Sequence, residues 1–162
     1  MRIRQVKANI RVLGLAAAPL VGGFAAVGAV VRGREGLEGV LFFMSLGGDA
    51  TEAFIGALAG SGHRAQVRVI LVDAASLPAG CAVDPARLAA GTGKPVLALS
   101  AGGAELDART MFEWRGRVVV CVGLAEADAA RVLDAASVGG RPEALRLAGM
   151  VAGALAEGLH KV

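Results

Sequence analysis

The sequence has 162 residues and a mass of 16.2 kDa, which suits a single domain over residues 1–162 with one core. Two cysteines, Cys81 and Cys121, stand too far apart for a metal-binding spacing, and two histidines are too few for a histidine-based metal site. The formal charge of +3, from 17 basic and 14 acidic residues, allows a polyanionic partner without requiring one.

The amino-terminal region raises the question of export or membrane insertion. Four basic residues precede a run of uncharged residues, 12–31. Pro19 and four glycines interrupt this run, and leucine and isoleucine are sparse in it, so its insertion into a bilayer is weakly favoured. We therefore expect a cytoplasmic protein with no membrane partner, in which both cysteines are reduced and behave as small core residues.

The first elements in the chain are three β-rich runs at residues 10–16, 24–32 and 38–45. The segments "PLVGG" and "GREG" between them are typical of tight turns. The chain is therefore predicted to begin with an antiparallel meander.

A helix is predicted next, over "GGDATEAFIGALAGSG", because Asp49 can cap its first turn and Glu52 follows at the spacing of a capping box. The following segment, "QVRVILVD", is rich in β-branched residues, as expected for a strand buried on both faces. This strand ends at Asp73, which makes the Asp73 carboxylate a candidate site residue.

Asp84 and Pro85 predict the start of a short helix, which should stop at Gly91 to Gly93 before the strand "PVLAL". Residues 104–114 are predicted to be helical, "GRVVVCVG" to be a strand, and the remaining segments to form two helices, the last of them long. This order predicts an α/β, ribonuclease H-like mixed sheet: three antiparallel strands, then parallel crossover units, with helices on both faces.

Few motifs carry chemistry. The segment "GTGKPV" resembles a phosphate loop, but Lys94 leads into Pro95 and a strand where a phosphate loop leads into a helix. Asp73 could present a carboxylate into the crevice at the end of a central strand, or it could simply cap the following turn, "DAAS". Both interpretations of Asp73 stay open at this point.

Several segments together resemble a known family. They are "RVLGLAAAP", "LEGVLFF", "GGDATE", "RVILVDAASLPAGCAVD", "TGKPVLAL" and "RPEALRLAGMVAGAL". In these segments the chain is similar to archaeal proteins of the domain of unknown function 99, which are associated with endonuclease dU and are similar in fold to endonuclease V. Residues 100–117 look shortened relative to that family.

The resemblance implies a nuclease site that depends on Mg²⁺ or Mn²⁺ and acts on DNA with deaminated bases. It assigns Asp73 as a catalytic residue and metal ligand and Asp49 as a second metal ligand, and it places Glu143 and Arg146 at positions that contact nucleic acid. The chain departs from the family at three positions. Ala16 and Ala17 replace two expected acids, and Gly149 replaces a histidine.

Without the two acids, a divalent ion at Asp73 would have one negative ligand where a working site offers two or three. We therefore expect a catalytically degenerate relative of the deaminated-base nucleases, with weak or absent metal binding and with DNA, a protein or a second copy of the chain as partner. Two alternatives stay open. One is an active DNA-repair endonuclease that combines Asp73 with Glu38, Asp49 or Glu52, and the other is a non-catalytic protein or small-ligand binding module.

Overall fold

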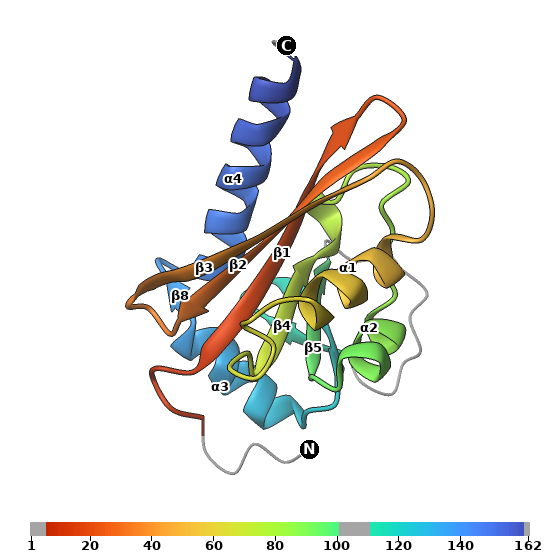
Figure 1. Cartoon of the computed structure of the whole chain (residues 1–162). Helices are drawn as coiled ribbons and strands as arrows, with labels where there is room; N and C mark the ends of the chain where they lie inside the picture. Colours follow the sequence, from red (N-terminus) through yellow and green to blue (C-terminus); the bar gives the residue numbers. More distant parts are fainter. Residues whose placement is uncertain (1–5, 101–110, 161–162) are drawn as a thin grey trace.

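The computed structural model describes residues 6–100 and 111–160, which form a seven-stranded sheet covered by helices (Figure 1). The strand order is β3-β2-β1-β4-β5-β7-β6. The strands are β1 (Arg11–Leu20), β2 (Gly23–Arg32), β3 (Gly36–Ser45), β4 (Val69–Asp73), β5 (Val96–Ser100), β6 (Met111–Trp114) and β7 (Arg117–Val122). The helices are α1 (Ala50–Ala59), η1 (Ala74–Ser76), α2 (Pro85–Thr92), α3 (Glu126–Ala135) and α4 (Glu143–His160), and the small strands β8 (Ser137–Val138) and β9 (Arg141–Pro142) pair before α4.

The sheet is mixed, as predicted. β1, β2 and β3 form the antiparallel meander, and β1, β4 and β5 run parallel to one another. The last part differs from the expected crossover unit, because β7 pairs antiparallel with β5 and forms a hairpin with β6. Arg115 and Gly116 both have positive φ, 49° and 77°, as a tight two-residue hairpin turn requires.

The helix predicted over residues 104–114 is therefore wrong for residues 111–114, which form β6, while residues 104–110 lie outside the described part of the chain. Arginine rarely adopts a positive φ, so "RG" carries a weaker hairpin signal than asparagine or aspartate before glycine.

β1 is longer than the predicted run 10–16. It continues to Leu20, and the chain turns at Val21 and Gly22. β4 pairs only with residues 12–15 of β1, so the second half of β1 extends past its parallel neighbour and is paired on one side, with β2. Ala16 and Ala17 consequently lie inside a strand and not at its end.

The helices lie in two layers, one on each face of the sheet (Figure 1). α1 and α2 contribute Phe54, Leu58 and Leu88 to a core with Leu13 and other residues of one face. α3 and the start of α4 cover the other face in a second core cluster. The predicted caps are present: the Asp49 side chain accepts a hydrogen bond from the Glu52 amide, and the Asp84 side chain accepts from two amides at the start of α2.

α4 approaches β1 closely because both surfaces carry small residues. Ala16 and Ala18 of β1 are buried with Ala148 and Ala152 of α4. Two strand residues advance about 6.6 Å and four helical residues about 6 Å, so alternate positions of β1 stay in register with every fourth position of α4.

Gly14 is the tightest point of this contact. A Cβ at Gly14 would lie 2.4 Å from the Ala144 carbonyl carbon and 2.7 Å from the Leu145 amide nitrogen. Both atoms belong to the backbone, which cannot rotate away as a side chain can.

Strand β3 forms one edge of the sheet and exposes Val40, Phe42 and Met44 at alternate positions. The association with a protein partner or a second copy that the composition led us to expect stays a prediction. In residues 6–100 and 111–160, no helix combines the length and the apolar character needed to cross a membrane.

Gly14→Ala is expected to destabilise the protein by about 1–3 kcal/mol, because the added methyl must push α4 away from β1. Gly149→Ala makes the same chemical change on the exposed side of α4, where an added Cβ has no neighbour within 4 Å. It should stabilise the protein by about 1 kcal/mol through helix propensity. Urea unfolding of the two variants measures whether the free energy of unfolding changes in opposite directions. An unchanged free energy of unfolding for Gly14→Ala would contradict the close contact.

Both cysteines should be unreactive in the folded protein. They are free and buried, and burial raises the pKa of the Cys81 thiol to about 11 and also raises the pKa of Cys121. At pH 8 only about one Cys81 thiol in a thousand is ionised, and the thiolate is the reactive form. A thiol-reactive chromogenic disulfide should therefore label neither cysteine until denaturant unfolds the chain, when it should label both; rapid labelling of the native protein would contradict this placement.

Candidate functional site

The Asp73 carboxylate lies at the carboxyl end of β4 and is held by an arginine. Arg117 at the start of β7 donates two hydrogen bonds to it, from Nη2 to Oδ1 at 2.7 Å and from Nη1 to Oδ2 at 3.3 Å. Oδ1 also accepts from the Ala75 amide at 3.2 Å, so Asp73 caps η1. The Asp73 side chain is 19% exposed, and both of its oxygens are engaged.

Ala16 is the residue of β1 beside Asp73. Leu15 pairs with Val72 in the parallel register, so Ala16 and Asp73 are the next positions along two strands about 4.8 Å apart. Both side chains point to the face covered by α4, since Ala16 packs against α4 and Val72 points to the opposite core.

Ala17 points away from Asp73. Strand β1 is extended through this position, and Ala17 packs against the core on the α1 side. Of the two positions at which the resemblance implies acids, only position 16 lies on the Asp73 face, because successive strand residues face opposite sides.

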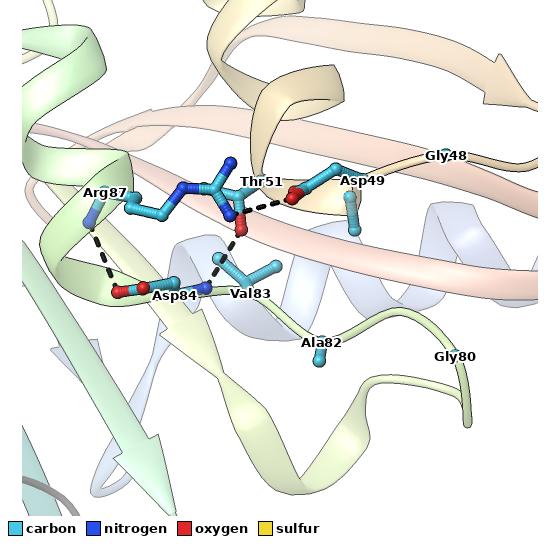
Figure 2. Close-up of a pocket in the computed structure, with 9 residues that line it drawn as sticks. Gly48, Asp49, Thr51, Gly80, Ala82, Val83, Asp84 and Arg87 are labelled. Atoms are coloured by element: carbon cyan, nitrogen blue, oxygen red, sulfur yellow. Dashed lines mark hydrogen bonds and ion pairs between the residues drawn. The ribbon is translucent and has the colours of Figure 1, made fainter.

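Asp49 and Glu52 at the start of α1 share one arginine, Arg87. Figure 2 shows the Asp49 side of this arrangement. Nη1 of Arg87 donates to Oδ2 of Asp49 at 2.7 Å, and Nη2 donates to Oε1 of Glu52 at 3.0 Å. The hydrogen bond from Arg87 is the main reason that the pKa of Asp49 lies below its ordinary value. Asp49 thus caps α1 and also neutralises the charge of Arg87, which belongs to α2.

A shallow pocket lies between the starts of these two helices. It is lined by Gly48, Asp49, Ala50, Thr51, Gly80, Ala82, Val83, Asp84 and Arg87 (Figure 2). The buried Thr51 hydroxyl accepts a hydrogen bond from the Asp84 amide at 3.0 Å. This bond connects the Asp49 turn to the Asp84 cap, which gives Thr51 a structural role in the position of the pocket wall.

Glu143 and Arg146 neutralise each other at the start of α4. Nε of Arg146 donates to Oε2 of Glu143 at 2.9 Å, Nη2 donates to Oε1, and Nη1 lies 3.2 Å from the sulfur of Met150. Arg146 lowers the pKa of Glu143. Gly149 lies exposed one turn further along the helix, with open space around it.

The donor set does not fit the divalent cation that the resemblance implies. Each acid weighed as a ligand is paired with an arginine: Asp73 with Arg117, Asp49 and Glu52 with Arg87, and Glu38 with Arg11. In the part of the chain that the structure describes, no three His, Cys, Asp or Glu side chains converge to hold an ion. Magnesium and manganese are held by several oxygen ligands at once, so these separate ion pairs are no substitute.

Arg87 and Arg117 are the site residues that sequence analysis missed. Arg87 is 38 positions from Asp49, and Arg117 is 44 positions from Asp73. Neither pairing has a short-range spacing that could have signalled it. The fold brings each pair together.

Sequence comparison identifies related proteins. A family model described as Endonuclease dU matches residues 8–110, a range that includes Ala16, Asp49 and Asp73 but ends before α4. A UPF0215 protein from Methanothermobacter thermautotrophicus is 39% identical over 100 residues, which are 58% of this chain and 49% of that protein. The match thus spans about half the length of the curated relative.

Three solved structures share the fold, at sequence identities that support no more than the fold. A protein of unknown function from Archaeoglobus fulgidus has a TM-score of 0.78 at 22% identity, over 90% of this chain and 97% of the other. Endonuclease V from Ciona intestinalis, in complex with a 24mer DNA containing an inosine followed by a ribo-adenosine, has a TM-score of 0.69 at 10% identity over 92% and 86%. Endonuclease V from Bacillus subtilis has a TM-score of 0.64 at 13% identity over 93% and 81%.

The mixed sheet with its two helix layers is thus similar in fold to the endonuclease V proteins, which have a ribonuclease H-like fold. The family match covers well over half of the chain and includes its central strands. This chain belongs to the endonuclease dU family.

Proposed function

We propose that this chain is a catalytically degenerate member of the endonuclease dU family that binds DNA without cutting it. The observation that carries the proposal is the two-point contact between Arg117 and Asp73, with Ala16 beside it. A guanidinium with one positive charge stands against the carboxylate on which the family's divalent chemistry would depend.

A cation at Asp73 faces two separate obstacles. It must first displace Arg117, and a paired, partly shielded carboxylate loses about 1–3 kcal/mol when its charged hydrogen bonds break. This cost lowers cation affinity roughly ten- to hundredfold. The cation then finds an alanine methyl in place of a second carboxylate, so its remaining charge is not neutralised.

DNA is the partner that this proposal favours. The fold is shared with an endonuclease V in complex with a DNA that contains an inosine, and the chain carries a net charge of +3. Arg146 would take part only if DNA phosphate replaced Glu143, because the two side chains neutralise each other in the free protein. A cytoplasmic location stays a prediction.

The competing function is an active DNA-repair endonuclease in which Glu38, Asp49 or Glu52 supplies the missing ligands. The positions of these acids argue against it. Asp49 and Glu52 share Arg87 at the start of α1, and Glu38 pairs with Arg11 at 2.7 Å. Each of these carboxylates would have to break its ion pair with arginine before it could bind a cation together with Asp73.

The protein should not nick DNA strands that carry deoxyuridine or deoxyinosine in the presence of Mg²⁺ or Mn²⁺, because no cation is held against the scissile phosphate. It should still retard the same strands at low salt in a gel-shift assay. Clear turnover that Asp73→Asn abolishes would overturn the proposal of degeneracy. Absence of binding at low salt would overturn the proposal that DNA is the partner.

Cation binding should be restored by an acid at position 16 and not by one at position 17. We expect Ala16→Asp with Arg117→Gln to bind Mn²⁺ at least about tenfold more tightly than Arg117→Gln alone, since two carboxylates then face the ion. Ala17→Asp with Arg117→Gln is the matched control, with the same charge on the opposite face of β1.

Calorimetric titration with Mn²⁺ measures the three affinities, and circular dichroism verifies that each variant is folded. Equal affinities for the two aspartate variants would contradict the alternation of residues 16 and 17. Tight Mn²⁺ binding by the unmodified protein would contradict the proposed degeneracy.

A further inference from the structure

A depression at the amino ends of β4 and β5 gathers positive charge. Arg64 and Lys94 line it, and Arg68 is the residue immediately before β4. The remaining lining residues are small or uncharged: Ala59, Ser61, Gly62, Ala65, Thr92 and Gly93. Because β4 runs from Val69 to Asp73, about 13 Å of strand separates this depression from the Asp73 carboxylate, which lies at the other edge of the sheet.

In residues 6–100 and 111–160, these three cations have no carboxylate partner within ion-pair distance. Among the described residues, the side chains of Arg64, Arg68 and Lys94 take part in none of the ion pairs, whereas the arginines at the other sites described above are paired with acids. The pKa of Lys94 is lowered, mainly by burial. The positive charges of Arg68 and Arg64 lower this pKa further.

Helix dipoles account for part of this charge but not for all of it. α1 ends at Ala59 and α2 at Thr92, so the negative ends of both helices lie near the depression. Two helix ends contribute about −1 elementary charge together, against three positive side chains. A surplus of about two positive charges remains.

We infer that Arg64, Arg68 and Lys94 form a binding site for a phosphoryl group, supplied either by a nucleic-acid backbone or by free phosphate. Two guanidinium forks can each present paired N–H donors to phosphate oxygens, and the Lys94 ammonium adds a compact positive charge. None of the described residues that line the depression is aromatic, so they offer no surface on which a base could stack. The site therefore recognises phosphate and not base identity. This inference does not depend on whether the Asp73 site binds a cation or cleaves DNA.

The nucleic-acid source is tested with a triple variant, Arg64→Gln, Arg68→Gln and Lys94→Gln. Fluorescence anisotropy with a labelled duplex is measured at several salt concentrations. Three lost phosphate contacts should weaken binding by at least about tenfold at low salt and make the slope of log affinity against log salt shallower by about 2–3.

The control removes the same charge from exposed positions elsewhere, as Arg115→Gln, Arg131→Gln and Arg141→Gln. It should change affinity by less than about twofold, with the slope preserved. Thermal unfolding verifies that both triple variants are folded. Equal losses in the two variants would show that DNA responds to overall charge, and this would overturn the nucleic-acid source.

The free-phosphate source is tested by titration of the ¹⁵N-labelled protein with inorganic phosphate. Saturable shifts of the Gly93 and Lys94 amides that vanish in the Arg64, Arg68, Lys94 variant would support a site for small phosphates, even if the duplex result is negative. No such shifts, together with equal DNA losses in the two triple variants, would overturn the inference. The nicking assay tests only the Asp73 site, so neither of its results changes the conclusion about phosphate binding by Arg64, Arg68 and Lys94.

Discussion

The contact between β1 and α4 is the constraint on which the arrangement of the candidate site depends. Gly14 leaves room for the backbone of Ala144, and Ala16 and Ala18 continue the contact with Ala148 and Ala152. The contact holds the helix that carries Glu143 and Arg146 against the strand that lies beside Asp73. A carboxylate at position 16 would have to share this closely packed, water-poor surface with the helix.

This packing gives a second physical reason for Ala16. Under the proposed function, the alanine stands where the family has a metal ligand, and in the structure it supplies the small surface that α4 needs to lie close to the sheet. The proposed loss of the acid is consistent with this tight packing. A buried carboxylate without a cation would be costly to desolvate, whereas an alanine adds apolar contact.

Arginines take over the neutralisation of charge at the carboxyl edge of the sheet. Asp73 lies against Arg117, and Asp49 with Glu52 lies against Arg87. A guanidinium and a divalent ion both favour the ionised carboxylate, but only the ion can act as a Lewis acid or activate water. Under the proposed function, the arginines keep this edge ordered and charge-balanced without the chemistry of a metal centre.

Local interactions explain which features could be predicted from the sequence. The Asp49 and Asp84 caps involve amides two or three residues away, and the predicted helices begin where these caps place them. The ribonuclease H-like fold was also predictable from the order of elements, whereas the family roles of Asp73, Ala16 and Ala17 stay predictions. The Arg115–Gly116 hairpin was not predictable, because arginine rarely occupies a left-handed position and its signal is weak.

Only the tertiary structure decided which charged side chains pair at the site and which residues share a face of the sheet. That Arg117 reaches Asp73 depends on β7 running antiparallel beside β5, and that Ala16 and Ala17 point to opposite faces depends on β1 continuing to Leu20. The surplus of positive charge near Lys94 likewise arises because the segments that precede β4 and β5 lie side by side. Sequence by itself determined the residue types and the local caps, since these act over a few residues; the pairing of charges dozens of residues apart is a property of strand order and direction.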